Sequence, residues 1–255
     1  MATVSAPRVR PLVGRFYITM AAICVAIAFG GFFSTYWLQV GRGTFTGSGL
    51  LHLHGLLFSL WTLFFLSQAR LVANRNLKSH RAWGMLGISL ATAMLFTGIA
   101  VVIHGLHERI AAGFDAPARA FAIVPVSGIL TFAGFVIAAL LNLRRPEWHK
   151  RFMLLATVAI LQAAVARFFF LAATGGGPGL RPGLGAPMPI EQSIPAGILI
   201  GLLVVAAMVH DWRTHGRVHP AYLWGFGVMV TVQVLRPVVG YSDAWYRVTD
   251  LLLAF

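Results

Sequence analysis

The chain has 255 residues, of which 58% are hydrophobic and 11% are charged, and its formal net charge at pH 7 is +13. Charged residues make up about a quarter of a typical soluble domain, so this composition excludes a soluble fold and predicts one membrane domain surrounded by lipid. Nucleic acid is excluded as a partner, because the basic residues lie at the ends of apolar segments instead of forming a stripe beside aromatic side chains. The single cysteine, Cys24, excludes a disulfide framework and a cysteine-rich metal site.

Seven apolar segments reach the length of about 20 residues that a membrane-spanning helix needs, although the sixth is short. The first follows three arginines, but its apolar run is too long for a signal peptide and no small-residue cleavage site follows it. The sequence therefore predicts an all-α, polytopic transmembrane helix bundle. In chain order its spans are Phe16–Val40, Leu50–Val72, Trp83–Ile103, Phe121–Leu141, Phe152–Ala173, Ile194–Val209 and Leu223–Val239.

Two segments outside the spans have distinctive compositions. The glycine-rich segment 174–187 lacks the preceding strand and the following Lys-Ser/Thr of a phosphate-binding loop, so it predicts a flexible external loop. The tail 241–255 mixes large apolar residues with polar ones, which predicts a short amphipathic helix along the membrane interface.

The loops between the spans differ in charge. Thirteen Lys and Arg residues lie on the side of the N-terminus and five on the opposite side, while Arg167 and Arg236 lie inside spans. Because short cytoplasmic loops carry an excess of Lys and Arg, this asymmetry predicts a multi-pass protein of the bacterial cytoplasmic (inner) membrane. Its N-terminus is expected in the cytoplasm and its C-terminus outside.

An internal repeat relates three of the spans. His80, His149 and His219 each precede an apolar helix, and they are 69 and 70 residues apart. Arg167 lies 18 residues after His149, and Arg236 lies 17 residues after His219. The pattern predicts a bundle built from repeated helical hairpins.

Three segments, Leu51–Gly55, Glu147–Thr157 and Arg213–Trp224, carry a resemblance to known proteins. With their His-x-His, His-Lys-Arg-x-Met-Leu-Leu and Gly-Arg-Val-His-Pro motifs, they resemble a family of uncharacterised bacterial multi-pass membrane proteins. This resemblance covers roughly residues 50–224 and implies a fold and a location but no chemistry. Helices that open with His-Lys/Arg and a Met-Leu run are also loosely similar to a small four-helix family linked to haem-copper oxidase maturation.

Four histidines are expected near the outer face, at the facing ends of the second and third spans: His52, His54, His104 and His107. Neutral imidazole is a ligand for zinc, copper and haem iron, and consecutive antiparallel spans place the four at one depth. A set such as His54, His104 and His107 could hold a metal ion or haem. The alternative is that histidines at a membrane edge lie among lipid headgroups.

The inner face supplies a second candidate set, consisting of His80, His149 and His219 and joined by His210 and His215. Three equivalent histidines could converge on a metal or haem if the repeats pack around a common axis. The alternative is that each of them serves the start of a helix at the membrane edge.

Arg167 and Arg236 are the most unusual residues within the spans. An arginine near the centre of a membrane helix costs about 2.5–3.5 kcal/mol on insertion scales, and such residues usually face the protein interior or a wet cavity. Counting from His149 and His219 places both roughly 25 Å along a hydrocarbon core of about 30 Å. Candidate partners are Glu191, Asp243 or an anionic ligand, with hydrogen bonds from Gln162 and Gln233, and snorkelling to headgroups is the alternative.

Three functions are compatible with these observations. The first is a protein that binds haem b, copper or zinc through the outer histidines, in a redox or oxidase-maturation role. The second is a non-catalytic accessory or assembly subunit with a membrane-complex partner. The third is a transporter or receptor for a small anion, with Arg167 and Arg236 as the anion-binding residues. No Ser-His-Asp, paired-carboxylate or zinc-protease pattern is present, so no catalytic residue is assigned.

Overall fold

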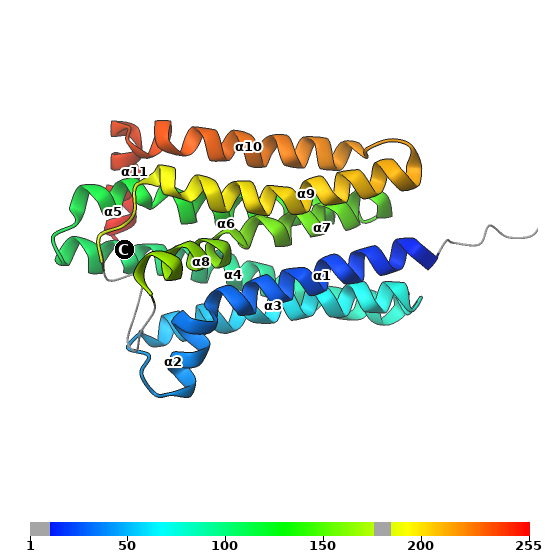
Figure 1. Cartoon of the computed structure of the whole chain (residues 1–255), viewed down its shortest axis with the longest axis horizontal. Helices are drawn as coiled ribbons and strands as arrows, with labels where there is room; N and C mark the ends of the chain where they lie inside the picture. Colours follow the sequence, from blue (N-terminus) through cyan, green and yellow to red (C-terminus); the bar gives the residue numbers. More distant parts are fainter. Residues whose placement is uncertain (1–10, 176–184) are drawn as a thin grey trace, which may run out of the picture.

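A computed structural model describes residues 11–175 and 185–255, with side chains described from residue 15 onward in the first range. Within these ranges every regular element is a helix, and the long helices run alongside one another, which confirms the predicted all-α bundle (Figure 1). Arg8, Arg10, Arg181 and the middle of the glycine-rich segment lie outside the described residues. The elements are α1 Pro11–Phe32, the π-helix Phe33–Trp37, α2 Leu38–Gly41, α3 Gly49–Ala73, α4 Leu77–Ala111, α5 Asp115–Phe121, α6 Ile123–Leu141, α7 Pro146–Ile160, α8 Gln162–Thr174, the 3-10 helix Ile190–Ser193, α9 Ile194–His215, α10 Pro220–Gly240 and α11 Asp243–Leu253.

The described residues form seven helices, some composed of two or three consecutive elements, that are long and apolar enough to cross a membrane. Several of them extend beyond the predicted spans: α4 covers Leu77–Ala111, and α9 runs to His215. These helices continue past the apolar runs because polar side chains at their ends find partners. The side chain of Asn76 accepts a hydrogen bond from the Ser79 amide at 3.1 Å and caps α4, and Asp211 near the end of α9 pairs with Arg151.

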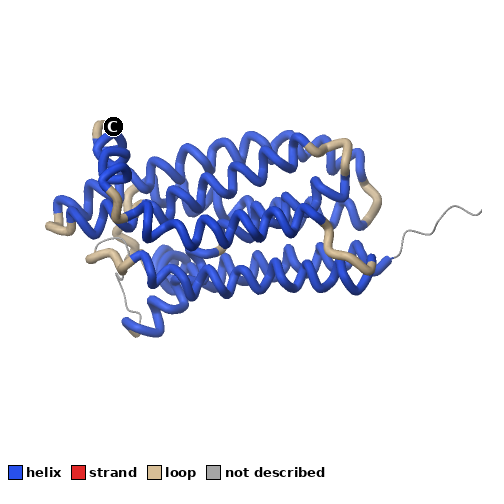
Figure 2. Tube along the Cα trace, turned by 90° about the horizontal axis from the view of Figure 1, so that it is seen from above, coloured by secondary structure: helices blue, strands red, loops and turns tan. Residues whose placement is uncertain are grey.

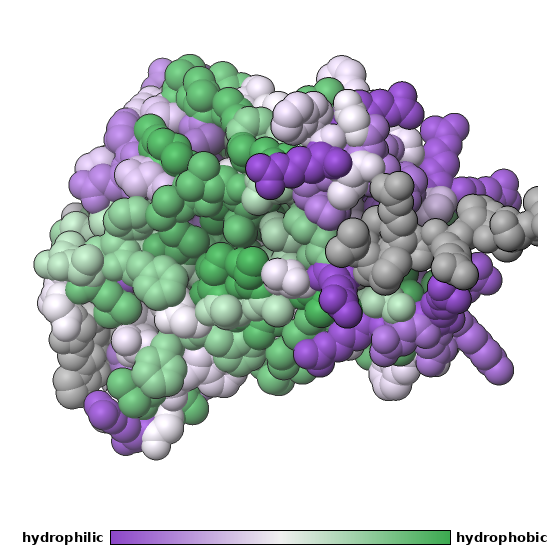
Figure 3. Space-filling view, turned by 45° about the vertical axis from the view of Figure 1, so that its right-hand side comes forward, coloured by the Kyte–Doolittle hydropathy of each residue, from purple (hydrophilic) through white to green (hydrophobic). Residues whose placement is uncertain are grey.

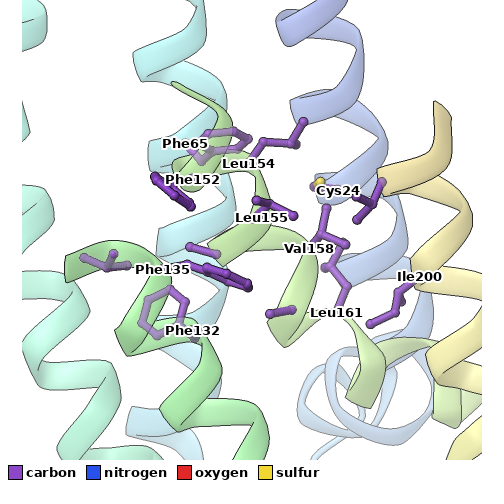
Figure 4. Close-up of a cluster of buried hydrophobic side chains, with 14 of the residues drawn as sticks. Cys24, Phe65, Phe132, Phe135, Phe152, Leu154, Leu155, Val158, Leu161 and Ile200 are labelled. Carbon is purple, nitrogen blue, oxygen red and sulfur yellow. The ribbon is translucent and has the colours of Figure 1, made fainter. Parts of the chain in front are cut away.

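The hydrophobic core surrounds α7, whose side chains Leu154, Leu155 and Val158 are buried (Figure 4). Side chains from α1, α3, α4, α6 and α9 pack against them. Small residues allow the closest helix contacts, as is usual in membranes. A Cβ on Gly31 would overlap the backbone oxygen of Ala164, so only glycine lets α1 approach α8 this closely.

The outside of the bundle is also apolar. Figure 3 shows hydrophobic side chains over the middle of the molecule and hydrophilic ones concentrated at its right-hand end. This end contains the α6–α7 and α9–α10 connections, and we call it the basic end. We call the opposite end the α11 end. Exposed leucines, valines and phenylalanines along the helices need lipid around them, because an apolar surface of this extent is rare on soluble proteins.

The predicted amphipathic tail forms a helix, α11, which lies across the end of the bundle (Figure 2). Its buried Trp245 donates from Nε1 to the backbone oxygen of Arg119 at 2.8 Å. Arg119 in turn forms ion pairs with Asp115 and Asp250, each at 2.6 Å. The tail is therefore fastened to α5, while its place along a membrane interface stays a prediction.

Candidate functional site

Arg236 is almost wholly buried, with 5% of its surface exposed, and it joins three helices. Its Nη1 donates to Oε1 of Gln162 at 2.7 Å and to Oε1 of Gln233 at 2.6 Å. Its Nε donates to Oγ of Ser127 at 2.8 Å. The guanidinium therefore ties α10 to α6 and α8, and we call Arg236, Gln162, Gln233 and Ser127 the Arg236 network.

The two glutamines are held so that their carbonyl oxygens face the guanidinium. Nε2 of Gln162 donates to the backbone oxygen of Ser193 at 2.8 Å, and Nε2 of Gln233 donates to Oγ of Ser193 at 3.2 Å. The amide dipoles stabilise the cation but carry no formal charge. The network therefore retains the positive charge of Arg236.

Local helix geometry places these side chains together. Gln233 precedes Arg236 by three residues, so both lie on the same side of α10. The helices α7 and α8 follow one another directly and are separated only at Leu161. Gln162 is the first residue of α8. The Leu161 amide bonds back to Val158 over three residues at 3.0 Å, a tighter turn than that of an α-helix, and this turn changes the direction in which α8 presents its side chains.

A cavity of about 310 Å³ lies beside the network, between α6, α7, α8, α9 and α10. Arg236, Gln162, Gln233 and Thr131 contribute its polar lining, and the other lining residues are apolar or glycine. Nη2 of Arg236 donates to none of the described residues. A Cβ on Gly128 would lie 3.9 Å from this nitrogen, so the glycine leaves the space beside it open.

The two carboxylates predicted as partners of these arginines do not pair with Arg236 in the described residues. Glu191 accepts a hydrogen bond from the hydroxyl of Tyr241 at 3.1 Å instead. Asp243 is the first residue of α11 and makes no ion pair among the described residues. The expectation that Gln162 and Gln233 contribute hydrogen bonds is correct for Arg236.

Arg167 lies in different surroundings. Its guanidinium carbon is 5.1 Å from the centre of the Phe32 ring, a cation–π contact with α1. Its Nε is buried and has no hydrogen-bond partner among the described residues. Arg167 lies near His54 and Arg109. It therefore belongs to a basic region near α3 and α4 and not to the Arg236 network.

The two arginines also differ in their spacing from the preceding histidine. Arg167 and Arg236 follow their histidines by 18 and 17 residues, and a difference of one residue turns a side chain by about 100° around a helix. The interruption at Leu161 adds a further change of direction in α8 only. The two arginines therefore do not form a joint anion site in the structure.

Three of the four outer histidines lie within hydrogen-bond distance of a neighbouring group. Nδ1 of His52 is 3.1 Å from the hydroxyl of Tyr36, and Nε2 of His104 is 3.3 Å from Oγ of Ser48. Nδ1–H of His107 donates to the carbonyl oxygen of Ile103 at 3.1 Å. The described residues contain no group of three or more His, Cys, Asp or Glu side chains placed to hold a metal ion. A metal or haem at these residues stays a prediction.

His54 differs from the other three. Its ring packs on Phe58 at 4.0 Å, and its Nδ1 is buried without a hydrogen-bond partner among the described residues. It also lies near Arg167.

Two of the three inner histidines come together. The rings of His80 and His149 have their centres 6.4 Å apart, and Nδ1–H of His149 donates to the carbonyl oxygen of Ala139 at 3.0 Å. His219 instead caps α10, where its Nδ1 accepts from the Ala221 amide at 3.1 Å. Partial burial and the positive charge of Arg151 lower the pKa of His219, which favours the neutral ring that this cap requires.

A buried ion pair at the basic end was not predicted from the sequence. Nε and Nη2 of Arg151 donate to the two carboxylate oxygens of Asp211 at 2.8 and 2.6 Å, and both residues are 2% exposed. Nη1 of Arg151 also contacts Glu147 at 2.6 Å. Both residues lie outside the predicted spans Phe152–Ala173 and Ile194–Val209, but Asp211 follows the buried Ala207 by one helical turn and so lies on the same face of α9.

The comparisons with known proteins add no relatives: no protein-family model, no curated protein and no solved structure matches this chain.

Proposed function

We propose that this chain is a membrane-embedded binding protein, a receptor or transporter, for an anionic ligand, and that Arg236 recognises the anion. The observation that carries the proposal is a buried arginine, beside a cavity, whose hydrogen-bond partners are all neutral. A charge in an apolar environment is costly unless it is paired. An anion in the cavity supplies the missing charge, and Nη2 is available to bind it.

The orientation expected from the charge of the loops is part of the proposal. With the basic end in the cytoplasm, the Arg236 network lies in the outer half of the bilayer, since Arg236 is the seventeenth residue of α10, about 24 Å from its first residue. The ligand is then taken from, or delivered to, the outer side of a bacterial cytoplasmic membrane.

The test compares two probes that share an apolar chain and differ in charge. The protein is reconstituted in nanodiscs of zwitterionic lipid, and its thermal unfolding is followed with added dodecanoate or dodecanol. We expect stabilisation by dodecanoate, amounting to about 2.7 kcal/mol at a hundredfold excess over Kd, and a smaller stabilisation by dodecanol, which shares the chain but lacks the charge. Arg236→Gln should remove the difference between the two probes. Arg247→Gln, at an exposed arginine of α11, is the matched control and should retain it.

Equal responses of the wild type and Arg236→Gln to dodecanoate would show that this arginine does not recognise the anion. The same result with other anions, including phosphate, would reject the proposal as a whole.

A second candidate function, binding of haem or a transition metal, is favoured by the contact between His80 and His149. The hydrogen bond from Nδ1 of His149 fixes its tautomer and leaves Nε2 as the nitrogen with a free lone pair, the arrangement usual for a metal-binding histidine. An absorption spectrum before and after dithionite, with metal analysis of the same sample, tests it. Loss of a Soret band or of bound metal in His80→Ala and His149→Ala would support it, and a colourless, metal-free protein from haem-supplemented cells would not.

A further inference from the structure

The cavity beside the Arg236 network has one polar end and a long apolar remainder. Its polar lining comes from the network and Thr131, whereas α9 and α10 line the rest with Ile198, Leu202, Val205, Phe226, Met229 and Val230. This distribution does not suit a small hydrated anion, which needs polar groups on all sides. We infer that the ligand is a single-chain lipid with a carboxylate head, an inference that rests on the proposed anion-binding function.

The cavity opens sideways toward the hydrocarbon of the bilayer. Ile198, Leu202 and Val230 line it and are also 60%, 55% and 44% exposed on the outside of helices that are apolar enough to span a membrane. A groove whose rim faces lipid is reached by a molecule dissolved in the membrane. The ligand therefore enters between α9 and α10 from within the bilayer.

The dimensions of the groove admit one chain. The lining residues on α9 run from Ile194 to Val205, which at about 1.5 Å per residue is roughly 16 Å. The volume of about 310 Å³ is at the lower end of the range of about 300–1,000 Å³ for ligand sites. A phospholipid with two acyl chains is too large, whereas a single alkyl chain of medium length fits.

The polarity of the groove matches the way a lipid lies in one leaflet. Arg236 is near the α11 end of α10, and the apolar lining continues along α9 and α10 toward the middle of the bundle. A carboxylate head at Arg236 and a tail toward the bilayer centre reproduce the orientation of a lipid in the leaflet at the α11 end. A carboxylate suits the site because its oxygens accept charge-assisted hydrogen bonds from a guanidinium nitrogen such as Nη2.

The experiment varies chain length at constant head group, using butanoate, octanoate and dodecanoate with the full chain in zwitterionic nanodiscs. Referred to the aqueous concentration, the apparent affinity should rise by about fourfold for each additional CH₂, because the bilayer and the groove both remove the chain from water. Val230→Trp, on the groove wall, should weaken dodecanoate binding by at least about tenfold and leave butanoate binding unchanged. Val228→Trp is the matched control, since Val228 has similar exposure, 45%, but does not line the groove.

The results separate this inference from the function on which it rests. Affinity that depends on Arg236 but not on chain length would overturn the lipid inference and leave anion binding in place. Equal binding of dodecanol and dodecanoate would identify a neutral ligand and overturn both. Equal effects of Val230→Trp and Val228→Trp on dodecanoate binding would show that the chain does not occupy the groove.

Discussion

Two buried arginines of this protein are bound by different kinds of partner. Arg151, at the basic end, has a bidentate contact with Asp211 and a second carboxylate, Glu147, within 2.6 Å. Arg236, toward the α11 end, has two amides and a hydroxyl. The first site is charge-compensated by the protein itself and has a structural explanation. The second is hydrogen-bonded but has no counter-ion among the described residues, and this difference separates an arginine that is structural from one for which we propose an anionic ligand.

The largest expected effect is on the compensated site. Asp211→Asn leaves Arg151 buried without its main counter-ion, and removal of one partner of a buried ion pair typically costs 3–5 kcal/mol. We expect a loss of about 3 kcal/mol in the free energy of unfolding, because Glu147 still contacts Nη1. Denaturant unfolding in detergent measures it. A loss below about 1 kcal/mol would mean that the pair does not stabilise the bundle.

Arg236→Gln should have a smaller effect on the ligand-free protein. The substitution removes an uncompensated charge and retains an amide donor for Gln162 and Gln233, so we expect a change in unfolding free energy within about 1 kcal/mol. The same denaturant unfolding assay measures this change. A loss as large as that of Asp211→Asn would show that Arg236 is as structural as Arg151 and would remove the contrast between the two sites.

Ser127→Ala tests whether the hydrogen bond to Nε positions the guanidinium of Arg236. It removes the acceptor of the Nε hydrogen bond and leaves both glutamines in place. We expect the freed Nε to become available to the anion, so the stability without ligand falls by about 0.5–1 kcal/mol while stabilisation by dodecanoate is kept. Thermal unfolding with and without dodecanoate gives both quantities. Loss of the dodecanoate response would mean that Ser127 positions the guanidinium.

The smallest effect concerns pH. Nδ1 of His219 caps α10 only when it is neutral, and the pKa of this ring is lowered in the folded state. The stabilisation is therefore present above the ordinary histidine pKa of 6.5 and is lost as the pH falls through that value toward the lower pKa of the folded state. The loss should be less than about 1 kcal/mol, the usual contribution of an N-cap. His219→Asn, which keeps a capping side chain without titration, should have a flatter profile of unfolding free energy between pH 7 and 5.

The helical class and the seven spans could be predicted because apolar length is a local property of the sequence. The partners of the polar residues could not, since they depend on the rotation of each helix about its axis. Gln162 and Gln233 were correctly associated with Arg236, but the arginines at matching positions of the repeat point in different directions. The interruption of the helix at Leu161 could not be predicted, because no proline or glycine lies beside it in the sequence. Asp211 looked like a loop residue because its neighbours Arg213 and His215 are polar.

The ion pair at the basic end also bears on how the protein is made. The chain is synthesised from its N-terminus, so α7 enters the membrane before α9 has been made. Asp211 is added 60 residues after Arg151, so the ion pair cannot form before then. Arg151 lies near the start of α7, within reach of the headgroup region, where a long cationic side chain can remain hydrated. Its burial becomes favourable only once α9 has arrived. The pair therefore links α7 to α9, two helices that are made at different times.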